Sequence, residues 1–175
     1  MAVWTQVGDG VLYTAESLSV VTAADIAVFK DMAAQTQRRR LRLCTHTGPE
    51  DALQEMLIVA SAETYIRPHR HFMRPESLHV IEGEADAVFF SEDGRIDRVA
   101  RLAPYGAGGA FYYRIDAPLY HTLSLRSPWL VFIEAALGPF RPERTEFAPW
   151  SPAENESEAV HRFCEALNRS IPSAE

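Results

Sequence analysis

The sequence predicts a mainly β fold, either a barrel or a double-sheet jelly roll, with one early and one late helix. Short apolar runs with β-like alternation recur between residues 40 and 137, and turn residues separate them. Helical spacing of apolar residues occurs only near the two ends of the chain. Many short strands with few helices are typical of barrels and jelly rolls. The chain has 175 residues, of which 47% are hydrophobic, and this is enough for the core of one domain.

The first 37 residues are expected to supply a strand and a helix that pack on the barrel. An apolar run at residues 11–13, bounded by glycines, predicts an edge strand. Apolar residues at helical spacing predict a helix over residues 23–37. Thr22 has the position of an N-cap, and Asp25 follows three residues later, as expected at a helix start.

Residues 38–138 are predicted to form the barrel. The expected strands cover residues 40–46, 54–61, 66–71, 76–82, 85–90, 95–102, 111–115, 120–126 and 129–137. A hairpin turn is predicted at residues 91–94, and the glycine-rich run at residues 104–109 is interpreted as a bend. Because side chains alternate along a strand, Arg40, Arg42 and His46 should share one face of the first strand.

Residues 139–175 differ in character from the barrel. Several prolines predict an irregular arm that wraps the barrel or a partner. The run from Ser151 to Glu154 has the form of a capping box, and an apolar stripe continues to about Asn168. This helix is expected to pack on the barrel or across a dimer. All three parts are predicted to belong to one structural domain.

Charge and composition exclude several classes of protein. The formal net charge is -7, from 24 acidic and 17 basic residues, which argues against a nucleic-acid or anionic-membrane surface. Cys44 and Cys164 stand far apart, so a disulfide framework is not expected. The first residues lack the pattern of a signal peptide, and no apolar run approaches the roughly 20 residues that span a bilayer. A cytoplasmic location is the expectation.

One stretch of the barrel carries the elements of a metal site. His69 and His71 stand two apart, so on a strand they project from one face, roughly 6.6 Å apart. Glu76 follows at an odd spacing, which requires a break in the strand, and Pro75 provides one. Two imidazoles and a carboxylate suit a transition metal ion.

The spacing of these residues resembles a known motif. His69-x-His71, four residues, Glu76, six residues and Gly83 are similar to the first motif of the cupin superfamily. The run at residues 115–121 resembles the second cupin motif, with the usual proline and glycine replaced. This resemblance implies a cupin double-stranded β-helix (jelly roll), with His121 as the fourth ligand.

Several runs between residues 38 and 150 are similar to the WbuC-type cupin metalloproteins, which occur among polysaccharide-related genes. Three histidines and a carboxylate would leave one or two positions open on an octahedral ion, where substrate or water binds. The expected cofactor is therefore one divalent ion, with iron, manganese, nickel, cobalt and zinc all open.

Five further residues are predicted to bind the substrate. Arg67 shares the strand face of His69, and Arg114, if inward, would offer a bidentate fork for carboxylate or phosphate; a surface position is its alternative. The other three are Arg42, His46 and Gln54. His46 could instead serve a dimer contact.

Two residues are predicted to take part in catalysis. Glu134 lies in an apolar strand, so it should be ion-paired, hydrogen-bonded or protonated. A pair with an arginine such as Arg114 or Arg67 is favoured, and a role as general base is the alternative. Tyr120 adjoins the predicted ligand His121, although a structural role in the barrel is the alternative.

These features favour a metal-dependent enzyme that acts on a small anionic or carbohydrate-derived molecule, as an isomerase or a dioxygenase. The alternatives are a binding or sensing protein without turnover and a metal-free sugar epimerase. A homodimer is expected.

Overall fold

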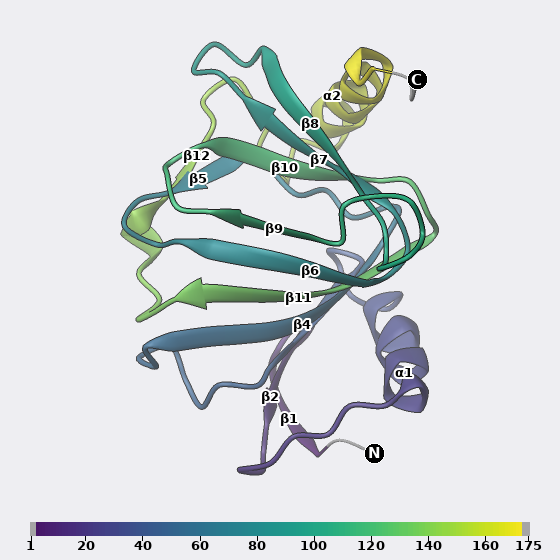
Figure 1. The fold of residues 1–175 in the computed structure, drawn as a ribbon, viewed down its shortest axis with the longest axis vertical. Helices are drawn as coiled ribbons and strands as arrows, with labels where there is room; N and C mark the ends of the chain where they lie inside the picture. Colours follow the sequence, from purple (N-terminus) through teal and green to yellow (C-terminus); the bar gives the residue numbers. More distant parts are fainter. Residues whose placement is uncertain (1–2, 173–175) are drawn as a thin grey trace.

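The computed structural model describes residues 3–172 as two facing antiparallel-rich sheets with a helix beside each (Figure 1). The seven-stranded sheet contains, in spatial order, β1 (Trp4–Gly8), β2 (Val11–Thr14), β3 (Arg40–Cys44), β4 (Leu53–Ser61), β11 (Trp129–Leu137), β6 (Glu76–Glu82) and β9 (Tyr112–Ile115). The five-stranded sheet contains β12 (Thr145–Phe147), β5 (His69–His71), β10 (Tyr120–Leu125), β7 (Ala85–Phe90) and β8 (Ile96–Leu102). The predicted mainly β, jelly-roll fold class is confirmed.

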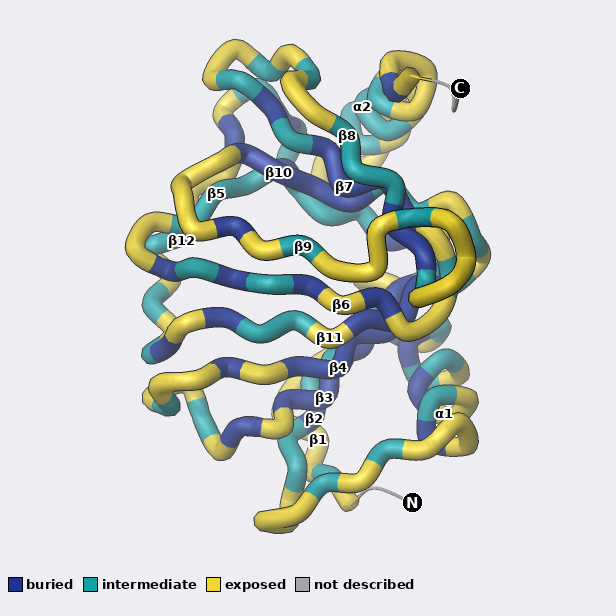
Figure 2. Tube along the Cα trace, in the orientation of Figure 1, coloured by how far each residue is buried: buried dark blue, intermediate teal, exposed yellow. Residues whose placement is uncertain are grey.

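The main core lies between the two sheets. The seven-stranded sheet contributes Met56, Ile58, Leu78, Val80, Leu130 and Phe132, and the five-stranded sheet contributes Ala85, Ala87, Leu102 and Leu123. Each larger side chain in such a core stabilises the fold by roughly 1.5–3 kcal/mol. Figure 2 shows buried segments along the strands, whereas many connections between them are exposed.

The α1 helix (Ala23–Ala33) covers the outer face of the seven-stranded sheet. Phe29 and Ala33 are fully buried there, against a cluster from β3, β4 and β11. The predicted cap is confirmed: Thr22 Oγ1 accepts from the Asp25 amide, and an Asp25 carboxylate oxygen accepts from the Thr22 amide at 2.8 Å. The helix ends four residues earlier than predicted, where Thr36 Oγ1 donates to the Ala33 carbonyl. No helix in residues 3–172 is long and apolar enough to cross a membrane.

The C-terminal helix α2 (Ser157–Ser170) begins later than predicted. The capping-box interpretation of Ser151 was wrong, because Ser151 Oγ instead donates to the Ala148 carbonyl and accepts from Arg67. Leu167 and Ile171 pack against Val88, Phe90 and Ala148, so the end of α2 covers the five-stranded sheet. The arm before it includes a short 3-10 helix, η1 (Pro142–Arg144), and β12, which pairs with β5.

Two further expectations needed correction or refinement. The run at residues 11–13 is not an edge strand, because β2 lies between β1 and a parallel β3. The predicted break between His71 and Glu76 is present, with Met73 in a left-handed conformation at φ 51°. This break carries the chain from the five-stranded sheet to the seven-stranded sheet. The segment between β9 and β10 crosses between the sheets in the same way, so the two motifs meet in the space between them.

Candidate metal centre

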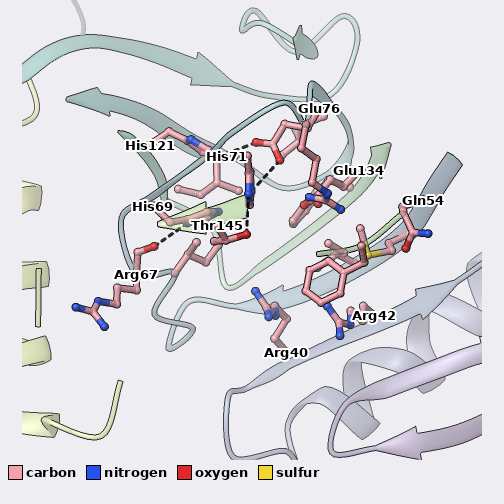
Figure 3. Close-up of a pocket in the computed structure, with 18 of the residues that line it drawn as sticks. Arg40, Arg42, Gln54, Arg67, His69, His71, Glu76, His121, Glu134 and Thr145 are labelled. Carbon is pink, nitrogen blue, oxygen red and sulfur yellow. Dashed lines mark hydrogen bonds and ion pairs between the residues drawn. The ribbon is translucent and has the colours of Figure 1, made fainter. Parts of the chain in front are cut away.

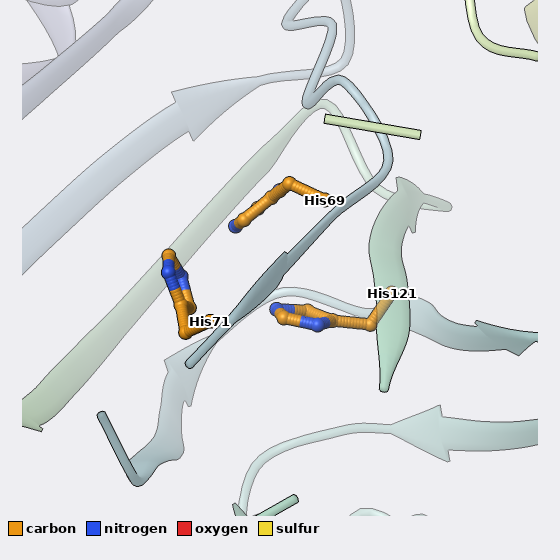
Figure 4. Close-up of side chains that lie close together, drawn as sticks. All are labelled: His69, His71 and His121. Atoms are coloured by element: carbon orange, nitrogen blue, oxygen red, sulfur yellow. The ribbon is translucent and has the colours of Figure 1, made fainter. Parts of the chain in front are cut away.

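Three histidines converge between the sheets. His69 and His71 come from β5, and His121 lies opposite His69 in the register of β10. Their potential ligand atoms all lie within 4.8 Å of one another. The imidazoles face a common centre in Figure 4, with ring centroids separated by 4.6 Å for His69–His121 and 4.9 Å for His69–His71. This spacing is close enough for one ion to contact all three rings.

The outer nitrogen of each ring is already occupied by the protein. His69 Nδ1 lies 2.8 Å from the Arg67 carbonyl oxygen, and His121 Nδ1 lies 2.9 Å from the Leu119 carbonyl oxygen. Because a carbonyl can only accept, these two Nδ1 atoms carry hydrogen and donate it. In the neutral rings, Nε2 therefore presents a lone pair to the centre. His71 is held by a third contact of 2.9 Å, between Nδ1 and Thr145 Oγ1.

Burial favours the neutral, ligating form of two of these histidines. It lowers the pKa of His69 to about 3, with the neighbouring histidines adding to the effect. It also lowers the pKa of His71 to about 4. Both rings are thus neutral at physiological pH, as a metal ligand must be.

Glu76 approaches the histidines from the opposite sheet. Its carboxylate oxygens lie 2.8 Å from His121 Nε2 and 3.3 Å from His71 Nε2. Burial alone would raise the pKa of Glu76, but the hydrogen bond and charge of His121 lower it to about 2. Two electron-pair acceptors at 2.8 Å require a cation between them, either a proton or a metal ion. Three imidazole nitrogens and a carboxylate oxygen are a donor set that fits a divalent transition metal.

The histidines line one part of a cavity of about 350 Å³ (Figure 3). Apolar side chains from both sheets form much of its wall, among them Met56, Ile58, Leu78, Leu123 and Phe132. Figure 3 shows Arg40, Arg42 and Gln54 across the cavity from the histidines. Pockets of this size and composition hold small molecules.

Four of the five predicted substrate-binding residues line this cavity: Arg42, His46, Gln54 and Arg67. Three of them already have protein partners. His46 Nδ1 accepts from the Glu55 amide at 3.1 Å, and Gln54 Nε2 donates to the Asp51 carbonyl at 2.9 Å. Arg67 donates to Ser151 Oγ at 3.0 Å and to its carbonyl at 3.1 Å. These three side chains shape the cavity wall.

Arg114 and Tyr120 lie outside the cavity. On β9 the inward position belongs to Tyr113, so Arg114 points outward and pairs with Asp116 at 2.6 Å. It is therefore not the partner of Glu134 that the sequence suggested. Tyr120 takes the opposite strand face from His121, where its hydroxyl donates to Glu146 and its ring lies 4.3 Å from the Arg70 guanidinium carbon.

Glu134 faces the cavity from β11, and its pKa is raised to about 7. Burial is the main cause and the negative charge of Glu76 adds to it, whereas Arg74 and Arg40 act in the opposite direction. Within residues 3–172, no ion pair reaches this carboxyl group. A carboxyl group with such a pKa can exchange a proton near neutral pH.

Sequence reasoning missed several residues at this site. Thr145 and Phe147 were assigned to an irregular arm, yet β12 brings Thr145 to His71 and Phe147 to His69. No sequence signal placed them there. Arg74 also gave no signal, because it lies in the break between the sheets. Arg40 could have been chosen, since it shares the strand face of Arg42.

Fold and site together define the class: a mainly β protein of cupin-like architecture whose two sheets hold a three-histidine candidate metal site. Comparison with family models matches residues 21–102 to a domain of unknown function, DUF6016, which is less than half of the chain. Comparison with curated proteins finds no match.

Similar solved structures include protein SO0799 from Shewanella oneidensis, at 12% identity and a TM-score of 0.49, covering 75% of this chain and 82% of that one. The capsular polysaccharide assembling protein CapF from Staphylococcus aureus matches at 19% identity and a TM-score of 0.45, covering 56% and 27%. A variant of Bacillus subtilis oxalate decarboxylase OxdC matches at 17% identity and a TM-score of 0.43, covering 55% and 24%. The chain thus spans about a quarter of the length of CapF and OxdC. None of these matches bears the WbuC name, so that narrower resemblance stays a prediction.

Proposed function

We propose that the protein binds one divalent transition metal ion through His69, His71, Glu76 and His121, and is a metal-dependent enzyme. Its substrate would be a small anionic or carbohydrate-derived molecule held in the adjoining cavity. The observation that carries the proposal is the direction of the imidazoles. Carbonyl groups hold the Nδ1 atoms of His69 and His121, which leaves their Nε2 atoms for a common ion, and His121 Nε2 lies 2.8 Å from a Glu76 carboxylate oxygen.

The chain's own residues suit the handling of an anionic substrate. Arginines in the cavity wall supply positive charge, and apolar residues from both sheets limit access of water. Glu134, with a pKa of about 7, can accept or return a proton at neutral pH. A bound metal ion would supply Lewis-acid chemistry for isomerisation or hydrolysis, or a dioxygen site if it is iron.

Measuring the metal content tests whether the protein binds an ion through these four residues. We expect the full chain, purified without added nickel, to carry about one divalent ion per chain by elemental analysis, and a His69→Ala/His121→Ala variant to lose it. His79→Ala is the matched control, because His79 is exposed on the outer side of β6 and does not line the cavity. Undiminished metal content in the double variant would reject the ligand assignment. Circular dichroism would show that each variant is folded.

Oxygen uptake tests the kind of chemistry. Uptake that requires both the metal and a sugar or carboxylic acid would identify a dioxygenase. Turnover without oxygen uptake would support an isomerase or a hydrolase. Tight binding of such molecules with no turnover would identify the alternative, a metal-dependent binding protein. A role in polysaccharide-related metabolism, a cytoplasmic location and a homodimer stay predictions from the sequence.

A further inference from the structure

Three arginines of the cavity make no side-chain hydrogen bond or ion pair within residues 3–172, although Glu134 carries the nearest opposite charge to Arg40 and Arg74. Arg40 and Arg42 project from β3, and Arg74 comes from the break between β5 and β6; all three line the same cavity. Across residues 3–172, no hydrogen bond or ion pair reaches any of the three guanidinium groups. Arg74 is only 7% exposed, and the buried Nε atoms of Arg42 and Arg74 have nothing to donate to.

Two other arginines of the cavity wall, Arg38 and Arg67, do have partners within the protein. Arg38 is paired with Glu154, and Arg67 makes two hydrogen bonds to Ser151. Arginines in this wall can thus obtain hydrogen bonds or an ion pair from the protein itself. Leaving three cations unpaired in a largely buried cavity costs stability, because both desolvation and mutual repulsion oppose it. Such a cost is expected where a ligand supplies the missing charge.

The balance of charge indicates what that ligand carries. The carboxylate of Glu76 already contacts His121, and the charge of Arg38 is neutralised by Glu154. The other charged groups in the cavity wall are the three unpaired guanidinium groups, the carboxyl group of Glu134, and Arg67, whose donors are used by Ser151. Three unpaired guanidinium groups against at most one carboxylate leave an excess of at least two positive charges, to which Arg67 adds. A dianionic group would offset this excess better than one carboxylate.

We propose that Arg40, Arg42 and Arg74 form a binding site for a phosphoryl group of a small phosphorylated molecule. A phosphate monoester carries close to two negative charges at neutral pH and three terminal oxygens, which several planar guanidinium forks can share. The rest of the molecule would extend across the cavity towards the histidines. The placing of the rest of the molecule near the histidines rests on the proposed function. The anion site formed by the arginines requires no metal ion.

Isothermal titration calorimetry tests the site on the full chain, stripped of metal with EDTA and kept in phosphate-free buffer at constant ionic strength. We expect inorganic phosphate to bind, glucose 6-phosphate to bind at least as tightly, and acetate to bind at least tenfold more weakly than phosphate. Arg42→Gln and Arg74→Gln should each weaken phosphate binding by about tenfold or more, since each removes charge-assisted hydrogen bonds. Arg114→Gln is the matched control, because that arginine lies outside the cavity, and its affinity should equal that of the wild type.

Three results would overturn the proposal: no measurable phosphate binding, equal phosphate affinity in the wild type and both cavity variants, or acetate binding as tightly as phosphate. Tight binding of inorganic phosphate with none of glucose 6-phosphate would identify a site for the free ion and overturn the assignment to a phosphorylated molecule. Elemental analysis of the same variants separates the two proposals. Arg42→Gln should keep its metal, and the His69→Ala/His121→Ala variant should keep its phosphate binding.

Discussion

Replacing Arg42 with methionine should make the ligand-free protein more stable. Within residues 3–172, the buried Nε of Arg42 has no acceptor, and its guanidinium group adds to the positive charge around Arg40. A buried donor left unsatisfied costs roughly 1–3 kcal/mol. Methionine fills similar space without charge, so the free energy of unfolding should rise by about that amount. For a chain of this size, each kcal/mol raises the melting temperature by roughly 2–4 °C.

Differential scanning calorimetry in phosphate-free buffer measures this change. Arg114→Met is the control, because Arg114 is exposed and its substitution should alter stability by no more than about 0.5 kcal/mol. Added phosphate should then stabilise the wild type, by about 2.7 kcal/mol at a concentration of 100 times Kd, and the Arg42→Met variant far less. A variant that melts below the wild type in the absence of phosphate would show that Arg42 stabilises the fold, and the reasoning would fail.

Three other substitutions test the site and the fold. Thr145→Val removes the partner of His71 Nδ1, and metal affinity should fall by about 10–100-fold in a competition titration. Gly83→Ala places a Cβ 2.0 Å from the Trp129 carbonyl oxygen in a left-handed conformation, so the melting temperature should drop sharply. Glu134→Gln should remove a pH dependence: since folding raises the pKa of this carboxyl group, its ionisation destabilises the metal-free fold as pH rises from about 4.5 to about 7. The loss amounts to a few kcal/mol at most, because one pKa unit corresponds to about 1.4 kcal/mol.

Matched controls separate these effects from general damage. Thr5 lies on the exposed edge strand β1, so Thr5→Val, the control for Thr145→Val, should leave metal affinity unchanged. Gly106→Ala has the same left-handed φ as Gly83 but open space around its Cβ, so it should cost only the backbone strain of roughly 1–2 kcal/mol. Equal losses at the two glycines would refute the role of the close contact. Urea titrations at pH 5 and pH 8 check Glu134, and an unchanged difference between the two pH values in the glutamine variant would refute its assignment.

Local sequence patterns predicted much of the barrel because they act over a few residues. The strands β7 and β11 begin and end where predicted, and Thr22 and Asp25 cap α1 as expected. The capping box predicted at Ser151 did not form, because a hydroxyl group can bond to whichever donor or acceptor the fold brings near. Here these partners are Arg67 and the Ala148 carbonyl, both set by tertiary structure.

The sequence by itself determined the mainly β fold class and the three histidines that converge, because alternation along strands and fixed spacing place side chains on known faces. Only the tertiary structure decided which charged residues share the cavity. Arg114 was excluded because Tyr113 takes the inward position on β9, whereas Arg74 was included by the break that joins the two sheets. Thr145 reached His71 through a strand from the far end of the chain. Such contacts depend on how distant segments pack, and the spacing of residues along the chain carries no record of that packing.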